Sequence, residues 1–557
     1  MKKRTVALLL TMAVSLSSLI GCASDSNEST GGASAKTETS AETQTAASSE
    51  AETEKGPLPD DYFAGTELDI AVYRINGDNT ESFNDKEIIK MVTEATGIKV
   101  NWIEIPKSGK EEQIANILSS GDMPDVMLGL LSSTDVASNM ELFYDLSEEG
   151  LLETYAPNVV SDYEEGGQNV FYYLTAPDGS IRSLAGNQGL SRSSDASAGW
   201  LINQVWLDKL GLKTPETADD LYDVLCAFRD NDANGNGDAS DEIPLSFCGM
   251  DGNYGFLNLA NAFGIANTGN SASNYYFMLD EQDKVVSVLD TDNFRAFLEW
   301  AHMLKEEKLL DVEGFSQTTE QYKAKGAADR LGLVMAYNTS QAGSTDEIMS
   351  NLIPVQALED VPARKTGAEG KPSFNITSFV VAADSEKVEA ALHWWNWLSG
   401  DKERFYLARF GQYYINEDGQ YVGDMDPAKK EEGVTYPGVW TLGMGNVQSP
   451  YGGPVDYDDI FDETNFRYAY REELADRGMM MSAAQHMKIA SRITAPEKIQ
   501  ERTFIETDLV AMVNGYIATS VVEGVTDASW TKFLEDLKIY RYYDWLDWWQ
   551  GYVNRDF

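Results

Sequence analysis

The clearest pattern of hydrophobic and polar positions lies in the first third of the chain, where short apolar runs alternate with amphipathic stretches. Three strands are predicted there, at residues 67–73, 98–105 and 125–130. Two amphipathic helices are predicted between them, at residues 84–97 and 110–118. Asn84 is the expected N-cap of the first helix and Gly97 its C-terminal stop. This order of elements implies right-handed crossovers and a parallel sheet.

Beyond about residue 180 the pattern changes to helices joined by long polar loops. Helices are predicted at residues 217–228, 292–308, 385–398, 458–477, 496–519 and 530–552. Short apolar strands are predicted at residues 331–337 and 379–383. We therefore expect an α/β protein with a helix-rich C-terminal part.

The N-terminus has the pattern of a secretory signal peptide over residues 1–21. Three basic residues at positions 2–4 precede an uncharged apolar run at 5–20, which is short for a membrane-spanning helix of about 20 apolar residues. The run ends in Leu-Ile-Gly-Cys, which resembles the bacterial lipobox. The resemblance implies that Cys22 carries palmitate-type acyl chains, two of which make a stable anchor. The alternative is an ordinary signal peptide that happens to contain a cysteine.

Residues 22–55 are expected to be the lipidated cysteine followed by a disordered tether. The segment after Cys22 contains no aromatic and no large aliphatic residue, so it cannot bury enough apolar surface to offset its ordering entropy. The alternative is a low-complexity linker without a tethering role. A tether predicts a location on the extracellular face of the cell membrane, with contact through the lipid only.

Composition excludes several classes of function. The formal net charge of -47 would repel a phosphate backbone, so no nucleic-acid partner is expected. The same charge disfavours an anionic polysaccharide, unless a local basic cleft overrules it. Cys226 and Cys248 are compatible with one disulfide or with two free buried thiols. The sequence has no Cys/His cluster that would indicate zinc.

Several motifs together resemble an extracellular solute-binding protein of a bacterial ABC import system, of the large carbohydrate-binding type. They are ATGIKV (95–100), SSGDMPDV (119–126), WLIN (200–203), WLDKLGL (206–212), DANGNG (232–237) and DEIPL (241–245). The resemblance covers nearly the whole mature chain. It implies a two-lobed, periplasmic-binding-protein-like clamshell, each lobe a mainly parallel sheet flanked by helices, with the ligand in the cleft between the lobes. Lobe 1 is expected at residues 60–180 plus 376–430, and lobe 2 at 181–375 plus 431–557.

The segment from Asp230 to Glu242 places oxygen-bearing side chains at alternate positions, with glycines where a loop must turn, as in a Ca²⁺ site. One register starts at Asp230 and resembles an EF-hand; the other starts two residues later. The resembled family carries a similar structural calcium loop, which favours the second register. The predicted ligands are Asp232, Asn234, Asn236, Asp238, Asp241 and Glu242. The alternative is a solvated Asn/Gly turn.

The ligand is expected to be an oligosaccharide or another polar solute, held by aromatic rings and by side chains that pair with hydroxyls. Candidates in loops or at strand ends are Arg74, Asn76, Asp125, Trp200, Tyr337, Trp440 and Tyr451. Tryptophans 394, 395, 397, 545, 548 and 549 lie in predicted helices and are expected to pack in the interior.

A binding protein is therefore expected, monomeric and without catalytic residues, that delivers its ligand to the transmembrane subunits of an ABC permease. One alternative is an exported carbohydrate-active hydrolase. The chain has 90 acidic residues, so the presence of a carboxylate pair carries no weight, and no G-x-S-x-G nucleophile elbow is present. The other alternative is a module that passes a bound ligand to a membrane receptor.

Overall fold

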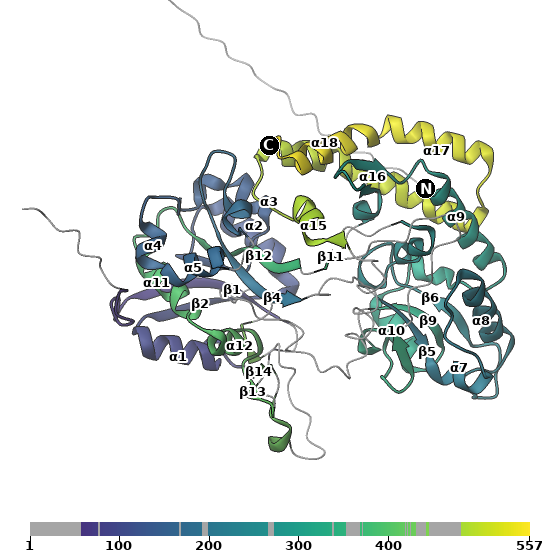
Figure 1. Ribbon diagram of the computed structural model, residues 1–557, viewed down its shortest axis with the longest axis horizontal. Helices are drawn as coiled ribbons and strands as arrows, with labels where there is room; N and C mark the ends of the chain where they lie inside the picture. Colours follow the sequence, from purple (N-terminus) through teal and green to yellow (C-terminus); the bar gives the residue numbers. More distant parts are fainter. Residues whose placement is uncertain are drawn as a thin grey trace, which may run out of the picture. The chain divides into compact units, whose positions relative to one another are not determined.

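The computed structural model describes residues 57–75, 78, 80–165, 169–191, 199–265, 272–336, 339–351, 368–369, 371–417, 419, 421–423, 425–430, 442–444 and 481–557 (Figure 1). The predicted helix at 458–477 lies outside these residues. No helix among them is long and apolar enough to cross a membrane. Cys226 and Cys248 are both free thiols, as one of the two alternatives predicted, but each is half-buried rather than buried.

The first sheet has five strands in the order β2-β1-β3-β12-β4. Their bounds are β1 Glu67–Arg74, β2 Lys99–Pro106, β3 Val126–Leu128, β4 Leu184–Ser191 and β12 Lys371–Val381. The strands β1, β2 and β3 are parallel and are connected by α1 (Glu87–Thr96) and α2 (Lys110–Ser120), which confirms the predicted order of elements. The strand β12 runs antiparallel to both of its neighbours.

The first crossover begins differently from the prediction. Ser82 caps a short 3-10 turn, η1 (Phe83–Asp85), and α1 starts only at Glu87, so Asn84 is not its N-cap. The C-terminal stop is confirmed, because Gly97 has φ 65° in the left-handed region.

A hydrophobic core surrounds this first sheet. Its helices include α3 Ser133–Ser138, α4 Leu151–Tyr155, α5 Pro157–Glu165, α6 Phe171–Leu174, α11 Val388–Leu398 and α12 Lys402–Phe410. Trp394 and Trp395 of α11 are fully buried in this core, and Trp395 stacks on Phe379 of β12. The packing role predicted for the tryptophans of this helix is confirmed.

The second sheet has four strands in the order β10-β5-β9-β6. Their bounds are β5 Gly199–Asn203, β6 Ile243–Ser246, β9 Leu331–Ala336 and β10 Met349–Asn351. Only β6 and β9 are parallel. Both sheets are therefore mixed rather than mainly parallel, because strands that return from distant parts of the chain join them antiparallel.

The second core covers this sheet with helices from two parts of the chain. These are α7 Gln204–Leu210, α8 Ala218–Asp230, α9 Asp292–Glu306, α16 Pro496–Glu523, α17 Asp527–Ile539 and α18 Tyr542–Asn554. The helix α10, Thr319–Ala327, packs through Tyr322 in a separate smaller cluster with β9. A single helix was predicted at 530–552, but Arg541 adopts φ 60° and divides the segment into α17 and α18. Small elements complete the fold: β7 Phe277–Leu279, β8 Val285–Ser287, β11 Ala368–Glu369, β13 Tyr414–Ile415, β14 Tyr421–Val422, β15 Met481–Ser482 and α15 Ala483–Ile489.

Candidate binding site

A cavity of about 530 Å³ opens where the parallel strands of the first sheet end. The pairing of Val72 with Leu128 brings the carboxyl ends of β1 and β3 to one edge, and ligands bind at such edges in open α/β sheets. The lining residues come from β1, α2, the turn after β3, α3 and β12: Tyr73, Lys110, Glu111, Ile114, Ala115, Leu118, Gly129, Leu130, Leu131, Ser132, Asp135 and Asn375.

The turn after β3 is held rigidly at the rim of this cavity. Gly129 donates its N–H to the carbonyl of Ser378 at 2.6 Å, which ties the turn to β12. Ser132 then caps α3, because its hydroxyl oxygen accepts the N–H of Asp135 at 3.1 Å, and the Asp135 carboxylate accepts the N–H of Ser132 at 2.8 Å. This capping box fixes the Ser132 and Asp135 side chains on one wall.

The lining combines one aromatic ring with apolar and polar walls. The half-buried Tyr73 ring carries the Lys110 ammonium 4.7 Å from its centroid. The amide oxygen of Asn375 accepts the N–H of Thr377 at 3.1 Å, which fixes this side chain at the cavity wall. An aromatic face next to hydroxyl-pairing side chains is the combination that sugars require.

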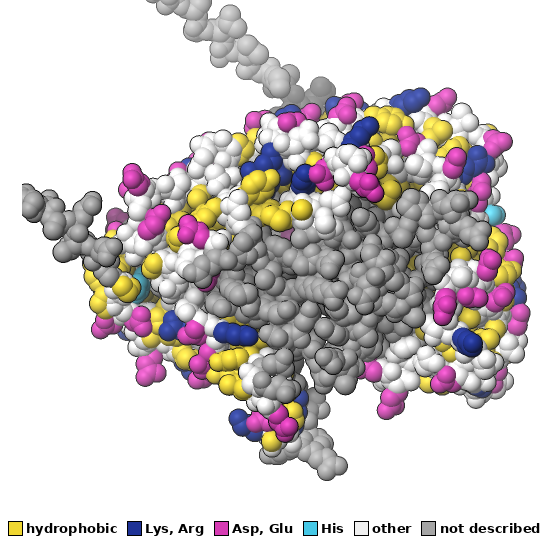
Figure 2. All heavy atoms as spheres, viewed as in Figure 1, with side chains coloured by type: hydrophobic (Ala, Val, Ile, Leu, Met, Phe, Trp, Pro, Cys, Tyr) yellow, Lys and Arg dark blue, Asp and Glu magenta, His cyan; other side chains and the backbone are white. Residues whose placement is uncertain are grey.

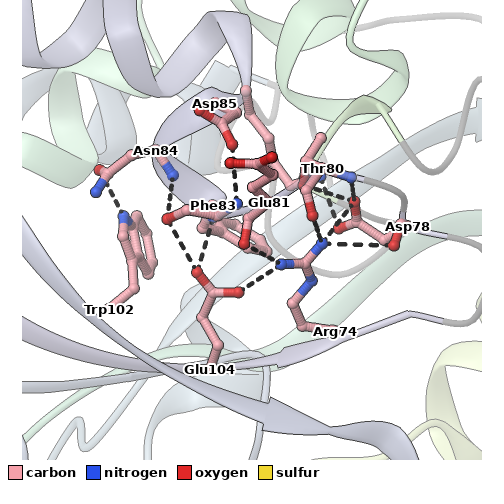
Figure 3. Close-up of polar contacts among 11 residues, drawn as sticks. Arg74, Asp78, Thr80, Glu81, Phe83, Asn84, Asp85, Trp102 and Glu104 are labelled. Carbon is pink, nitrogen blue, oxygen red and sulfur yellow. Dashed lines mark hydrogen bonds and ion pairs between the residues drawn. The ribbon is translucent and has the colours of Figure 1, made fainter.

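The loop after β1, at the same edge, is organised by ion pairs (Figure 3). Arg74 pairs with Glu104 of β2 at 2.7 Å and with Asp78 at 3.1 Å, and it donates to the carbonyls of Asp78, Thr80 and Glu81. Lys86 pairs with Asp78 at 3.0 Å, and both side chains are 1% exposed. We call these four charged side chains, Arg74, Asp78, Lys86 and Glu104, the ion-pair network.

The environment of the ion-pair network changes its pKa values. Burial alone would raise the pKa of Asp78, but hydrogen bonds from Thr80 and Lys86 outweigh it and the pKa is lowered. Burial lowers the pKa of Lys86, and the pairing with Asp78 offsets only part of that effect. The ion pairs of Arg74 with Asp78 and with Glu104 link the loop to β2.

The acidic loop after α8 is a series of tight turns held by its own side chains. The Asp232 carboxylate accepts the N–H groups of Gly235 at 2.8 Å and Gly237 at 3.1 Å. The Asp241 carboxylate accepts from the amides of Asn234 at 3.1 Å and Asn236 at 3.0 Å.

Two further features of this loop bear on a metal. Glu242 has a buried carboxylate oxygen, Oε2, that has no hydrogen-bond partner among the residues that the structure describes. Asp238 accepts from Ser240, so its side chain faces the next turn. Among the described residues no three His, Cys, Asp or Glu side chains are grouped as a metal site.

Comparison with known proteins identifies the family of this chain. A family model of bacterial extracellular solute-binding proteins matches residues 81–405, more than half of the chain. The chain belongs to this family. The family predicted from the sequence motifs is confirmed, and this solute-binding protein is a binder rather than the hydrolase considered as an alternative.

Two relatives of this solute-binding protein have described ligands. FusA of Streptococcus pneumoniae, a fructooligosaccharide ABC transporter substrate-binding protein, is 32% identical over 324 residues, which are 56% of this chain and 57% of FusA. YtcQ of Bacillus subtilis, a polygalacturonan/rhamnogalacturonan-binding protein, is 28% identical over 155 residues, 27% of this chain and 28% of YtcQ. The alignments thus span little more than half of the first relative and less of the second.

Solved structures confirm the two-lobed fold. FusA in complex with kestose superposes with a TM-score of 0.71 at 22% identity, over 88% of this chain and 99% of FusA. A solute-binding protein from Bifidobacterium longum infantis, described as binding HMO, gives a TM-score of 0.71 at 20% identity, over 88% and 98%. A further FusA structure is described as an EF-hand mutant in complex with fructo-nystose.

The predicted ligand residues that the structure describes, Arg74, Asp125 and Trp200, lie in different parts of the fold. Arg74 lies at the edge with the cavity, but its guanidinium is engaged in the ion-pair network. Asp125 precedes β3 and lies at the opposite edge, beside Asp69. Trp200 is 4% exposed in the second core and donates Nε1–H to the carbonyl of Asn258 at 3.3 Å. Asn76, Tyr337, Trp440 and Tyr451 lie outside the described residues. A ligand role for these seven residues stays a prediction.

Sequence reasoning did not select the residues that line the cavity, such as Tyr73, Lys110 and Asn375. The rule that ligands bind beyond the carboxyl ends of strands pointed to Arg74, one residue after Tyr73. Successive side chains of a strand point to opposite faces of the sheet, so Tyr73 lines the cavity and Arg74 does not.

Proposed function

We propose that this solute-binding protein captures a neutral oligosaccharide and delivers it to the membrane subunits of an ABC permease. The cavity at the carboxyl ends of β1 and β3, with Tyr73 beside Ser132, Asp135 and Asn375, is the observation that carries this proposal. The similarity to FusA over 324 residues supports the same ligand class.

Charge favours a neutral sugar over a uronate. The cavity lining carries one cationic side chain, Lys110, and two anionic ones, Glu111 and Asp135. Figure 2 shows Asp and Glu side chains scattered over the described parts of one face, with Lys and Arg between them, and acidic residues outnumber basic ones 90 to 43 in the whole sequence. A polyuronate would be repelled both on approach and in the cavity.

The remaining assignments follow from the sequence. Cys22 would carry the lipid anchor, and residues 22–55 would tether the binding body to the outer face of the cell membrane. The division into lobe 1 (60–180 plus 376–430) and lobe 2 (181–375 plus 431–557) stays a prediction, as does a monomeric state. Ligand contact with both lobes would favour the closed state, which the permease would recognise.

A calcium ion in the acidic loop is part of the proposal. The residues fit such an ion, because Glu242 has an unpaired buried oxygen and the carboxylates and amides of the loop supply hard oxygen donors. The ion would be structural, holding the turns together in place of some of their internal hydrogen bonds. Asp230 belongs only to the first register, and Glu242 only to the second.

Isothermal titration of residues 56–557 with kestose, nystose and trigalacturonate tests the ligand class. We expect the two fructo-oligosaccharides to bind and to be recovered unchanged, and the uronate not to bind. Tyr73→Leu should weaken binding at least tenfold, whereas Tyr62→Leu, at a 56% exposed tyrosine away from the cavity, should not. Absence of binding by the wild-type protein, or shortened products, would refute the proposal.

Thermal melting in calcium and in EDTA tests the metal. At a calcium concentration of 100 times Kd the stabilisation would be about 2.7 kcal/mol. Loss of this shift in Glu242→Gln but not in Asp230→Asn would identify the second register, and the reverse result the first. An identical midpoint for wild type in both buffers would leave the loop as a solvated turn.

A further inference from the structure

Lys110 differs from the other residues that line the cavity, because its ammonium lies over the aromatic ring there. The distance from the ammonium to the centroid of the Tyr73 ring is 4.7 Å. Both side chains are half-buried, and both line the cavity. The Tyr73 ring also packs against the hydrophobic core around the first sheet. One side of the ring is therefore turned toward the interior, and Lys110 covers the side that is turned toward the cavity.

The position of Lys110 does not stabilise its helix. Lys110 is the first residue of α2, and the N-terminal end of a helix carries a partial positive charge. A cation is unfavourable at this end, whereas the carboxylates of Glu111 and Glu112 in the same turn are favourable. None of the ion pairs among the residues that the structure describes includes Lys110. The Tyr73 ring is the partner of its ammonium, so the contact that holds this charge lies in the cavity.

The cavity around this contact needs the ring for a sugar. Beyond Lys110 the same face of α2 is apolar, because Ile114 and Leu118 follow at intervals of four residues and also line the cavity. The hydroxyl-pairing side chains of the lining come from the turn after β3, from α3 and from β12. Among the described lining residues Tyr73 is the one aromatic. A sugar face that stacks in this cavity must therefore use the surface that the ammonium covers.

We propose that Lys110 is an internal competitor of the oligosaccharide for the Tyr73 ring. In the ligand-free protein its ammonium covers the ring, and a sugar that stacks on the ring displaces the ammonium toward solvent. The flexible four-carbon stem of lysine allows this movement without a change in the backbone. This inference rests on the proposed function of the cavity. It predicts that removal of Lys110 strengthens binding, whereas removal of a ligand contact or of a structural residue weakens it.

Calorimetry with kestose tests the competition. Lys110→Ala should tighten binding about two- to fivefold, the range that corresponds to a cation–π contact at an exposed site. In the Tyr73→Leu background the same replacement should have no effect, because the ring for which Lys110 competes is gone. Lys107→Ala is the matched control, since Lys107 is an exposed lysine just before α2 that does not line the cavity, and it should bind like wild type. Weaker or unchanged binding by Lys110→Ala, or an equal gain in both backgrounds, would overturn the proposal.

A second readout needs no sugar. Reductive methylation with ¹³C-labelled formaldehyde converts lysines to dimethyl-lysine, which keeps its charge and is observed by NMR. The Lys110 resonance, identified by its loss in Lys110→Arg, should be shifted upfield by the ring and should return to the position of exposed lysines in Tyr73→Leu. Kestose should move it in the same direction. An unshifted resonance in the ligand-free protein would overturn the competition even where kestose binds. A shifted resonance in a protein that binds neither kestose nor nystose would refute the proposed function and the competition with it.

Discussion

Asp125 offers a sharp test, because the sequence predicts a ligand role and the structure shows its carboxylate engaged in three hydrogen bonds within the protein. Its carboxylate accepts hydrogen bonds at 2.8 Å from the N–H of Asp69, the hydroxyl of Ser385 and the ammonium of Lys387. The last two residues lie just before α11, about 260 residues further along the chain. The Asp125 side chain is 11% exposed. It therefore joins the start of β3 to the start of α11.

The contacts of Asp125 determine how much its replacement should lower the free energy of unfolding. Hydrogen bonds to a charged group contribute about 1.5–3 kcal/mol each, but removal of the carboxylate leaves exposed partners that water can reach. Lys387 is 38% exposed, so its ion pair contributes little. We expect Asp125→Ala to lower the free energy of unfolding by about 2–4 kcal/mol and Asp125→Asn by about 1–2 kcal/mol.

The pH dependence follows from the direction of the pKa shift. Burial alone would raise the pKa of Asp125, but the three hydrogen bonds outweigh it and the pKa lies below its ordinary value of 3.8. The stabilisation is then fully present above about pH 4 and is lost as the pH falls through the lowered pKa. The difference between wild type and Asp125→Asn should therefore shrink in acid.

Urea denaturation at pH 7 and pH 3, followed by tryptophan fluorescence, measures this difference. Asp122→Asn is the matched control, because Asp122 lies in the same turn, is exposed and carries the same charge. Its unfolding curve should match wild type at both values of pH. Equal stability of wild type and Asp125→Ala at pH 7, or loss of oligosaccharide binding at full stability, would refute the structural role.

Three further outcomes are expected. Lys86→Met removes one member of a buried pair but leaves Asp78 bound to Arg74 and Thr80. Chemical denaturation should therefore show a loss in the free energy of unfolding that is smaller than the about 3–5 kcal/mol of a fully broken buried pair. No loss at all would contradict the buried pairing. Trp200→Phe should lower the melting temperature, because it removes a hydrogen bond and leaves a cavity, and it should leave the Kd for kestose unchanged. A higher Kd at an unchanged melting temperature would support the predicted ligand role of Trp200. Gly97→Ala should lower the free energy of unfolding more than Gly121→Ala. Both glycines have positive φ, but only at Gly97 would an added Cβ meet Ala64, at 2.7 Å. Equal losses of stability in the two variants would argue against this close approach.

The sequence predicted those parts of the fold that local patterns determine. The strand and helix succession from β1 to β3 follows from alternation and from glycine stops, which depend on residues a few positions apart. The antiparallel entry of β12 into the same sheet does not, since its partner β3 lies more than 240 residues away. The break at Arg541 was also invisible, because the apolar pattern continues through it from Trp530 to Trp548.

The candidate site was harder to predict for a related reason. Trp200 follows a polar, glycine-containing stretch, which suggested a loop, yet its strand β5 pairs on both sides and buries the ring. Arg74 lies at the edge of the sheet where the cavity opens, but what it contacts depends on Glu104, on another strand. A sequence therefore indicates at which edge of a sheet a ligand is to be expected, whereas strand parity and long-range charge pairing decide which side chains lie at that edge.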